Sequence, residues 1–288
     1  MINFRHRLLA LPLLLFALFS GATAHGQDSV EPIRPVASLF TVSAGGAEVA
    51  DTYLSPLKYH GWGVGLGYTR LQAMKFSPEK WIMQLSASIN GNRTFNTARN
   101  ATMWRLDVDA DWAMMRRWRL PYSVTVAAGG FTGINGGVIY TARNGNNPAS
   151  AKGAWTVGAR ALATYPFHIG KLQMQARWQG SIPVTGIFFS PDYGELYYEI
   201  WLGNHSGLVH GAWFGNYFRL DNEVFVDLQL GTTLLRLGYR SNILSTKVND
   251  ITTRVVGNSF VLGVGGEWIS LGPKSLPSDK ARIISAIY

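Results

Sequence analysis

Cysteine is absent from the 288 residues of this chain, and charged residues are few, at 15%. The absence of cysteine excludes disulfides, cysteine-ligated zinc or iron–sulfur sites and thiol catalysis. The charged fraction lies below the roughly 25% of an average soluble domain. After residue 24, no stretch is both long and apolar enough for a membrane-spanning helix. The chain is nevertheless 47% hydrophobic, so its apolar side chains must be accommodated by a structure other than a membrane-spanning helix.

The first 24 residues have the composition of a secretory signal peptide. Arg5 and Arg7 supply a positive start, residues 8–19 an apolar centre, and residues 22–24 a small-residue cleavage site. We expect cleavage after Ala24, which leaves a mature chain with a formal charge of 9 − 2 = +7. Its scattered basic residues favour contact with lipid phosphates over nucleic acid. We divide the chain into a signal peptide (1–24), a barrel (25–271) and a C-terminal tail or closing strand (272–288).

The stretch from Trp104 to Met114 is the most informative part of the sequence. Successive side chains of a strand point to opposite faces, so this stretch has one apolar face and one charged face. The apolar face is unsuited to water, and the charged face is unsuited to a dry protein core. A closed barrel in a lipid bilayer, apolar outside and polar inside, satisfies both faces. The apolar face carries Trp104, Leu106, Val108, Ala110, Trp112 and Met114, and the other face carries Arg105, Asp107, Asp109 and Asp111.

The same two-residue period recurs along the chain, at 62–69, 81–90, 120–126, 155–165, 172–179, 224–230 and 260–268, after an ambiguous opening at 36–43. A soluble lipocalin-like barrel would alternate in the same way, with its apolar face inward. The spacing between strands favours the membrane form, because short turns at 75–80, 115–118, 166–170 and 221–222 alternate with long segments at 91–102, 130–153, 183–207 and 241–255. The register of residues 208–220 stays unassigned.

We predict an all-β fold, an antiparallel up-and-down transmembrane β-barrel of about ten strands in the outer membrane of a Gram-negative bacterium. A hairpin at 196–202 would make twelve strands. Residues 282–288 end in an aromatic residue, as many signals for the barrel-assembly machinery do, and are either a closing strand or a periplasmic extension.

Aromatic residues gather at the ends of the apolar faces, eight to ten positions apart. At roughly 3.3 Å per residue and a tilt of about 40°, such pairs span about 20–25 Å, the height of a lipid-facing band. We therefore predict two aromatic girdles in contact with outer-membrane lipids. Their members are Trp62, Trp81, Trp104, Trp112, Tyr122, Trp155, Tyr165, Trp178 and Trp268.

Charged residues on the polar faces predict an ionic network inside the barrel. Barrels of this width fill their interiors with side chains, and buried charges are normally paired. We expect Asp107, Asp109 and Asp111 of the 104–114 strand to pair with Arg160 and Arg177. This network would lie in the lower lumen and plug it. The alternative is a narrow diffusion channel. The predicted network comprises Arg105, Asp107, Asp109, Asp111, Arg160, Arg177, Asp227 and Glu267.

Function is therefore predicted to be non-enzymatic, with a plugged lumen and with external loops for binding or envelope structure. The best candidate binding loop carries Phe188, Phe189, Tyr193, Tyr197, Tyr198 and Trp201, because aromatic rings supply rigid contact area. Its partner is an unidentified extracellular or periplasmic component. No cofactor and no metal are expected.

A second alternative is a lipase or protease at the external rim. Such an enzyme needs a nucleophile or an activated water, together with a base. His205 and His210, close to Asp192, Glu199 and Ser206, form the one external cluster that fits. Their spacing matches no metal site, and the paired acid and acid–histidine motifs of ten-stranded outer-membrane proteases are absent.

Two segments, YLSPLKYHGWGVGLGYTRLQAM (53–74) and SFVLGVGGEWISLG (259–272), resemble a family of small exported Bacteroidetes barrel proteins that is known as a domain of unknown function. The resemblance extends over most of the mature chain. It implies an outer-membrane barrel and carries no active site.

Overall fold

The computed structural model describes residues 32–269 and 282–287. The predicted signal peptide lies outside them. The strands are β1 (Val36–Asp51), β2 (Ser55–Ala73), β3 (Trp81–Phe95), β4 (Thr102–Arg119), β5 (Thr125–Tyr140), β6 (Ala149–Ile169), β7 (Leu172–Phe189), β8 (Val209–Ala212), β9 (Tyr217–Leu230), β10 (Thr233–Val248) and β11 (Ile251–Trp268). Within these described ranges, two short helices, η2 (Pro121–Ser123) and α2 (Tyr197–Trp201), lie in connections.

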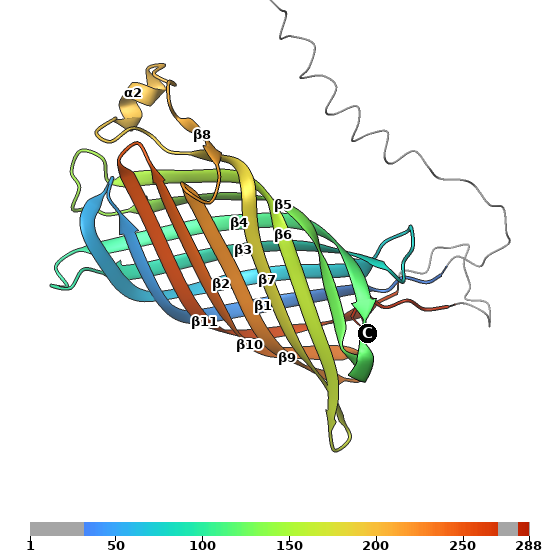
Figure 1. Ribbon diagram of the computed structural model, residues 1–288. Coiled ribbons are helices and arrows are strands. Elements are labelled where there is room, and N and C mark those ends of the chain that lie inside the picture. The colour runs from blue at the N-terminus through green and yellow to red at the C-terminus, as the bar shows by residue number, and fades with distance from the viewer. Residues whose placement is uncertain (1–31, 270–281, 288) are drawn as a thin grey trace, which may run out of the picture.

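Ten long strands close into a single antiparallel barrel (Figure 1). Each strand pairs with its neighbour along the chain, and β1 pairs with β11, from Val36↔Trp268 to Asp51↔Thr253. At Gly45 the two backbones approach so closely that a Cβ would lie 2.0 Å from the Asn258 carbonyl oxygen, which only glycine permits. We call the end of the barrel where β1 begins and β11 ends the terminal end, and the opposite end the loop end.

The strand number is ten rather than twelve. The 196–202 segment folds as α2 and not as a hairpin. The segment 208–220 becomes β8, a turn and the start of β9. β8 pairs only with the loop end of β7, at residues 186–189, and β9 pairs with β7 at residues 173–181. One edge of β7 is therefore paired by two separate strands, β8 near the loop end and β9 nearer the terminal end.

Several predicted turns were misplaced, because the strands are longer than the sequence pattern indicated. β4 runs through 115–118 to Arg119, so the turn follows at 120–124, where Tyr122 adopts a φ of 61°. β9 runs through 221–222, and β10 and β11 are joined by a two-residue turn at 249–250 in place of a long loop. The longest connection at the loop end is therefore the 190–216 segment between β7 and β9, which contains α2 and β8.

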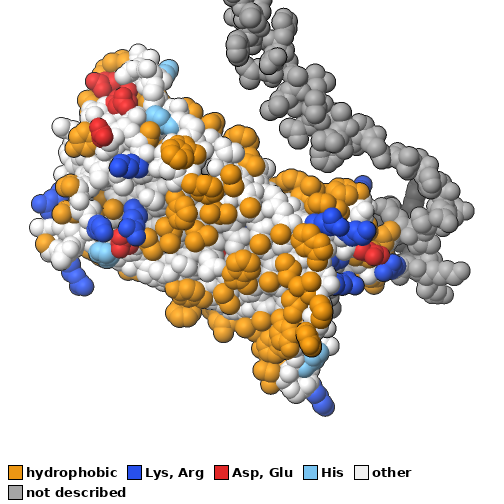
Figure 2. All heavy atoms as spheres, in the orientation of Figure 1, with side chains coloured by type: hydrophobic (Ala, Val, Ile, Leu, Met, Phe, Trp, Pro, Cys, Tyr) orange, Lys and Arg blue, Asp and Glu red, His pale blue; other side chains and the backbone are white. Residues whose placement is uncertain are grey.

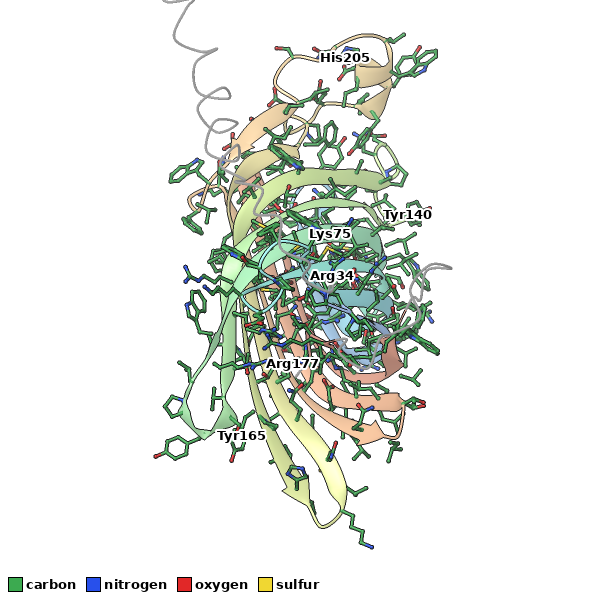
Figure 3. The ribbon with its side chains drawn as sticks, turned by 90° about the vertical axis from the view of Figure 1, so that its right-hand side faces the viewer. Arg34, Lys75, Tyr140, Tyr165, Arg177 and His205 are labelled. Carbon is green, nitrogen blue, oxygen red and sulfur yellow. The ribbon has the colours of Figure 1, made fainter. Side chains whose placement is uncertain are left out.

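The outer face of the barrel is apolar and exposed. Val64, Leu106 and Val108 are about half exposed, although each lies mid-strand. Figure 2 shows hydrophobic side chains over the middle of the barrel and charged ones gathered toward its ends. No helix among the described residues combines the length and the apolarity needed to cross a membrane. In Figure 3, Arg177 lies within the barrel, whereas Tyr140 and Tyr165 point away from it.

Candidate functional site: the barrel lumen

The lumen has three layers, which follow from the inward-facing residues of each strand. At the loop end, inward side chains form an apolar cluster, the loop-end cluster. At the terminal end a second apolar cluster forms, the terminal-end cluster. Charged and hydroxyl side chains occupy the middle layer. The loop-end cluster comprises Val49, Tyr53, Leu54, Tyr59, Ala101, Met103, Ile139, Ile251 and Val255. The terminal-end cluster comprises Ala37, Leu39, Leu71, Ile82, Ala113, Met115, Ala127, Phe131, Leu162, Leu234, Ala286 and Ile287.

The most deeply buried ion pair of the middle layer joins β9 to β10. Asp227 is 3% exposed and accepts hydrogen bonds from Arg236 Nε at 2.6 Å and Arg236 Nη2 at 2.7 Å. This two-point contact is the strongest geometry available to an arginine and a carboxylate. Arg177 Nε of β7 lies 3.5 Å from the same carboxylate, so one aspartate serves two arginines.

A second group crosses the lumen from β4 to β9. Arg219 Nη1 lies 2.6 Å from Asp109 Oδ1, and Arg219 Nε lies 2.9 Å from Asp221 Oδ2. Because Asp109 and Arg219 stand on strands that are not neighbours in the sheet, their contact bridges the interior instead of following the wall. The other pairs of the middle layer are Arg160–Asp111 at 2.5 Å, Arg105–Asp107 at 2.6 Å and Arg240–Glu223 at 2.5 Å. At the loop end, a further buried pair joins Lys152 Nζ to Asp51 Oδ2 at 2.7 Å.

The pairs of the middle layer define the lumen network, which has no net charge. Its cations are Arg105, Arg160, Arg177, Arg219, Arg236 and Arg240, and its anions are Asp107, Asp109, Asp111, Asp221, Glu223 and Asp227. Six positive and six negative groups balance one another. A balanced, internally paired set is what a structural plug requires, because an unpaired buried charge is costly.

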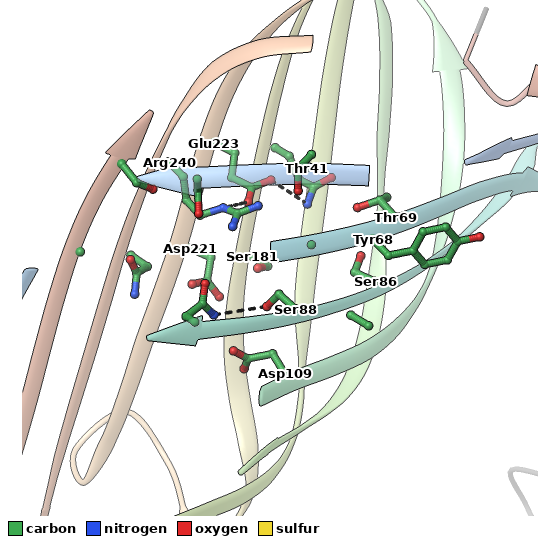
Figure 4. A pocket seen from close by; sticks show the side chains of 18 of the residues that line it. Thr41, Tyr68, Thr69, Ser86, Ser88, Asp109, Ser181, Asp221, Glu223 and Arg240 are labelled. Atoms are coloured by element: carbon green, nitrogen blue, oxygen red, sulfur yellow. Dashed lines mark hydrogen bonds and ion pairs between the residues drawn. The ribbon is translucent and has the colours of Figure 1, made fainter. Parts of the chain in front are cut away.

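Small side chains line the opposite side of the lumen. Thr41, Ser43, Thr69, Ser86 and Ser88 project from β1, β2 and β3 toward a cavity of about 170 Å³, and the lumen network lines its other side. Figure 4 shows Asp221, Glu223 and Arg240 among the labelled residues of this cavity. The cavity is therefore a polar chamber, with the two apolar clusters above and below it.

The structure places most of the predicted network in this layer, with three differences. Arg177 pairs with Asp227 rather than with the aspartates of β4. The aspartates lie mid-strand and not in the lower lumen, because β4 continues to Arg119. Glu267 lies apart, near the terminal end, where it accepts a hydrogen bond from Ser285 Oγ.

Sequence reasoning missed five members of the network: Arg219, Asp221, Glu223, Arg236 and Arg240. The signal for Arg236 and Arg240 was present, since they alternate with the outward-facing Leu235, Leu237 and Tyr239. The β9 members were hidden because residues 221–222 were interpreted as a turn.

Eight of the nine predicted girdle residues lie on strands with outward side chains. Trp62, Trp104 and Trp155 are about half exposed, and Trp268 is 67% exposed. Tyr122 is the exception, because it lies in the β4–β5 turn. The level of these rings in a bilayer stays a prediction.

The predicted binding loop divides into anchors and exposed rings. Phe188 is buried at the end of β7, and its ring packs against those of Tyr217 and His210. The Tyr197 hydroxyl accepts a hydrogen bond from the Ala151 amide at 2.6 Å. Tyr193, Tyr198 and Trp201 are 63–77% exposed, and Phe189 is half-buried. Of the six predicted rings, these three are the most exposed, whereas Phe188 and Tyr197 hold the loop in place.

Tyr53 fixes the loop over the loop end of the barrel. Its hydroxyl donates to the Glu195 carbonyl oxygen at 2.6 Å, and its ring meets that of Tyr197 edge-on at 5.9 Å. Burial, reinforced by Tyr197 and Glu195, raises the pKa of Tyr53 above the ordinary range of tyrosine. Burial also raises the pKa of Tyr197. Both hydroxyls therefore stay protonated at neutral pH.

The predicted hydrolase cluster is not assembled. His210 Nε2 lies 3.1 Å from the Ser190 carbonyl oxygen, and the Glu199 carboxylate accepts from the Leu196 amide. Among the described residues, neither His205 nor His210 forms an ion pair with a carboxylate, and no group of metal-ligating side chains is found. The arrangement offers no positive support for enzyme activity.

The C-terminal segment lies inside the barrel end. Ile284, Ala286 and Ile287 are 5–8% exposed, and Ala286 and Ile287 belong to the terminal-end cluster. The segment is not a closing strand, because β11 already closes the barrel against β1. It is a tail that covers the terminal end of the lumen.

A closed antiparallel barrel of ten long strands with an apolar exterior and an ionic interior defines the class of transmembrane β-barrels. Within that class, the chain belongs to the family described as Protein of unknown function (DUF3316), which matches residues 11–275.

Solved barrels share this arrangement only in outline. Outer membrane protease OmpT from Escherichia coli is 6% identical, with a TM-score of 0.44, and the match covers 85% of this chain and 100% of OmpT. The translocator domain of autotransporter NalP from Neisseria meningitidis is 11% identical, with a TM-score of 0.38 and coverage of 91% and 96%. An outer membrane channel from Pseudomonas putida F1 is 8% identical, with a TM-score of 0.34 and coverage of 86% and 100%. Scores this low say nothing about function. No protein of curated function matches the chain.

Proposed function

We propose that this protein is a non-enzymatic outer-membrane barrel of a Gram-negative bacterium whose lumen is closed to ions. The lumen network carries the proposal, since its six arginines and six carboxylates pair with one another inside the barrel. The apolar clusters at both ends support it, because an ion that passes beside apolar side chains pays a high desolvation cost.

In this proposal the terminal end faces the periplasm and the loop end faces the outside, as in other barrels with short periplasmic turns. The loop with Tyr193, Tyr198 and Trp201 is then the external surface for a partner or an envelope component. Outer-membrane lipids contact the apolar exterior, and the barrel-assembly machinery inserts the chain. A Bacteroidetes origin, which the two motifs imply, belongs to the same proposal.

Conductance of the purified, refolded protein in planar bilayers tests closure. We expect the wild type to give no stable single-channel steps, while a general porin refolded in the same way conducts. Asp109→Ala removes the carboxylate that bridges the interior to Arg219, and it should admit water and produce measurable current. Asp109→Glu keeps the charge and should conduct less. Stable steps from the wild type would refute the proposal.

The second candidate is a narrow diffusion channel, and the polar chamber of about 170 Å³ favours it. A channel predicts the reverse pattern. The wild type would already conduct, and Asp109→Ala would change ion selectivity with little effect on stability.

A further inference from the structure

The C-terminal segment Arg282–Ile287 contacts the barrel through side chains of three separate strands. Arg117 Nη1 of β4 donates to the Ser285 carbonyl oxygen at 2.7 Å, and Gln175 Nε2 of β7 donates to the Ile287 carbonyl oxygen at 3.1 Å. Glu267 of β11 accepts from the Ser285 hydroxyl. Arg117 and Gln175 are each 5% exposed, so these are buried donors aimed at a peptide backbone.

The segment is also held by side-chain packing and by contacts at its edge. Ala286 and Ile287 pack in the terminal-end cluster, and the segment shares an isolated parallel bridge with Ile33 and an exposed ion pair between Arg282 and Glu79. It is not part of the barrel ladder, so its departure breaks no hydrogen bond between the ten long strands. Its departure would leave the buried Gln175 amide without the carbonyl that it binds, which favours a site that is occupied.

The contacts define what the site recognises. Its donors bind main-chain carbonyl oxygens, Glu267 binds a hydroxyl, and the terminal-end cluster surrounds Ala286 and Ile287. A short extended peptide with a serine followed by a small and then a branched apolar residue meets all these requirements. Nothing in the contacts demands that the peptide belong to the same chain.

We propose that the terminal end of the barrel is a peptide-binding site, occupied by the protein's own Arg282–Ile287 segment as an exchangeable plug. A peptide of the same chemistry, supplied by another molecule, displaces the segment and takes its place. The proposal concerns the site itself and holds whether or not the lumen conducts.

The cysteine-free sequence allows a direct test in the full-length protein, folded in detergent micelles. Ala286→Cys places a single thiol in the site, and Ile283→Cys places one on the same segment at a position that is 58% exposed. We expect a charged maleimide to modify Ala286→Cys at least tenfold more slowly than Ile283→Cys. Ile284→Cys, at a position 7% exposed, replaces Ala286→Cys if that variant fails to show the heat-modifiable mobility of a folded barrel.

Exchange is then measured with a synthetic peptide of sequence RIISAI. An excess of this peptide should raise the rate of modification at Ala286→Cys toward that of Ile283→Cys, and a scrambled peptide should not. Gln175→Ala should raise the rate without any peptide, because it removes the donor to Ile287. Equal rates for the two thiols in the folded barrel would show that the site does not exist. Protection that neither the peptide nor Gln175→Ala changes would show a permanent part of the barrel, and would overturn the exchangeable plug.

Discussion

The contact of Asp227 with Arg236 and Arg177 predicts a large loss of stability when the aspartate is truncated. In Asp227→Ala, Arg236 loses both hydrogen bonds that it makes to the carboxylate, and Arg177 loses the carboxylate 3.5 Å away. Asp227 is 3% exposed and Arg236 9%, so water does not replace the lost partner. Removing one partner of a buried ion pair costs roughly 3–5 kcal/mol in the free energy of unfolding.

Urea unfolding of the protein in lipid vesicles, followed by tryptophan fluorescence, measures this loss. With a denaturant slope of about 2 kcal/mol/M, a loss of about 4 kcal/mol lowers the midpoint by about 2 M. The matched control is Glu79→Ala, which breaks the Arg282–Glu79 pair, whose side chains are 70% and 52% exposed. Surface pairs are worth about 0–1 kcal/mol, so the control should shift the midpoint little.

A double variant separates two contributions to this loss of stability: the lost ion pair itself, and the cost of leaving a buried arginine without its carboxylate. Asp227→Ala with Arg236→Ala should cost less than the sum of the two single changes, because the double variant also removes Arg236, the arginine that loses two hydrogen bonds in Asp227→Ala. If Asp227→Ala costs no more than Glu79→Ala, the lumen network does not stabilise the barrel and the reasoning fails.

Two further predictions concern the membrane and the orientation. Val108→Arg, at an outward mid-strand position that is 50% exposed, should cost about 2–4 kcal/mol in vesicles, whereas Leu202→Arg beside α2 should cost almost nothing; equal costs would argue against a lipid-facing exterior. On intact cells, a membrane-impermeant maleimide should label Trp201→Cys, whereas Lys171→Cys in the β6–β7 turn should react only after the outer membrane is permeabilised. The opposite pattern would reverse the assigned orientation.

The strands that alternate strictly were predictable from the sequence. In β4, Asp107 and Asp109 alternate with Leu106 and Val108, and this alternation indicated that the face with the aspartates is the solvated one. Strand ends were not predictable in the same way, because alternation fades where both faces become apolar. Near its end β4 carries Ala113 and Met115 inward, in the terminal-end cluster, and these resemble the residues of its outer face.

The partners within the lumen network could be predicted only in part. Asp111 with Arg160 followed from the expectation that buried charges pair. The contact of Asp109 with Arg219 depends on how the wall curves, since β4 and β9 are not neighbours in the sheet. The burial of the tail was hidden for another reason. Ile284 and Ile287 are apolar as a strand would be, and no local pattern shows that they lie inside a barrel.

The position of the tail has a consequence for how the protein assembles. Arg117, Gln175 and Glu267, which hold the tail, come from β4, β7 and β11 and meet only when β1 has joined β11. Contacts between residues so far apart in sequence form late in folding, after the entropy of closing long loops has been overcome. The Arg282–Ile287 segment therefore docks only after the wall is complete. The time between membrane insertion and the burial of position 286 would then report how long the barrel takes to close.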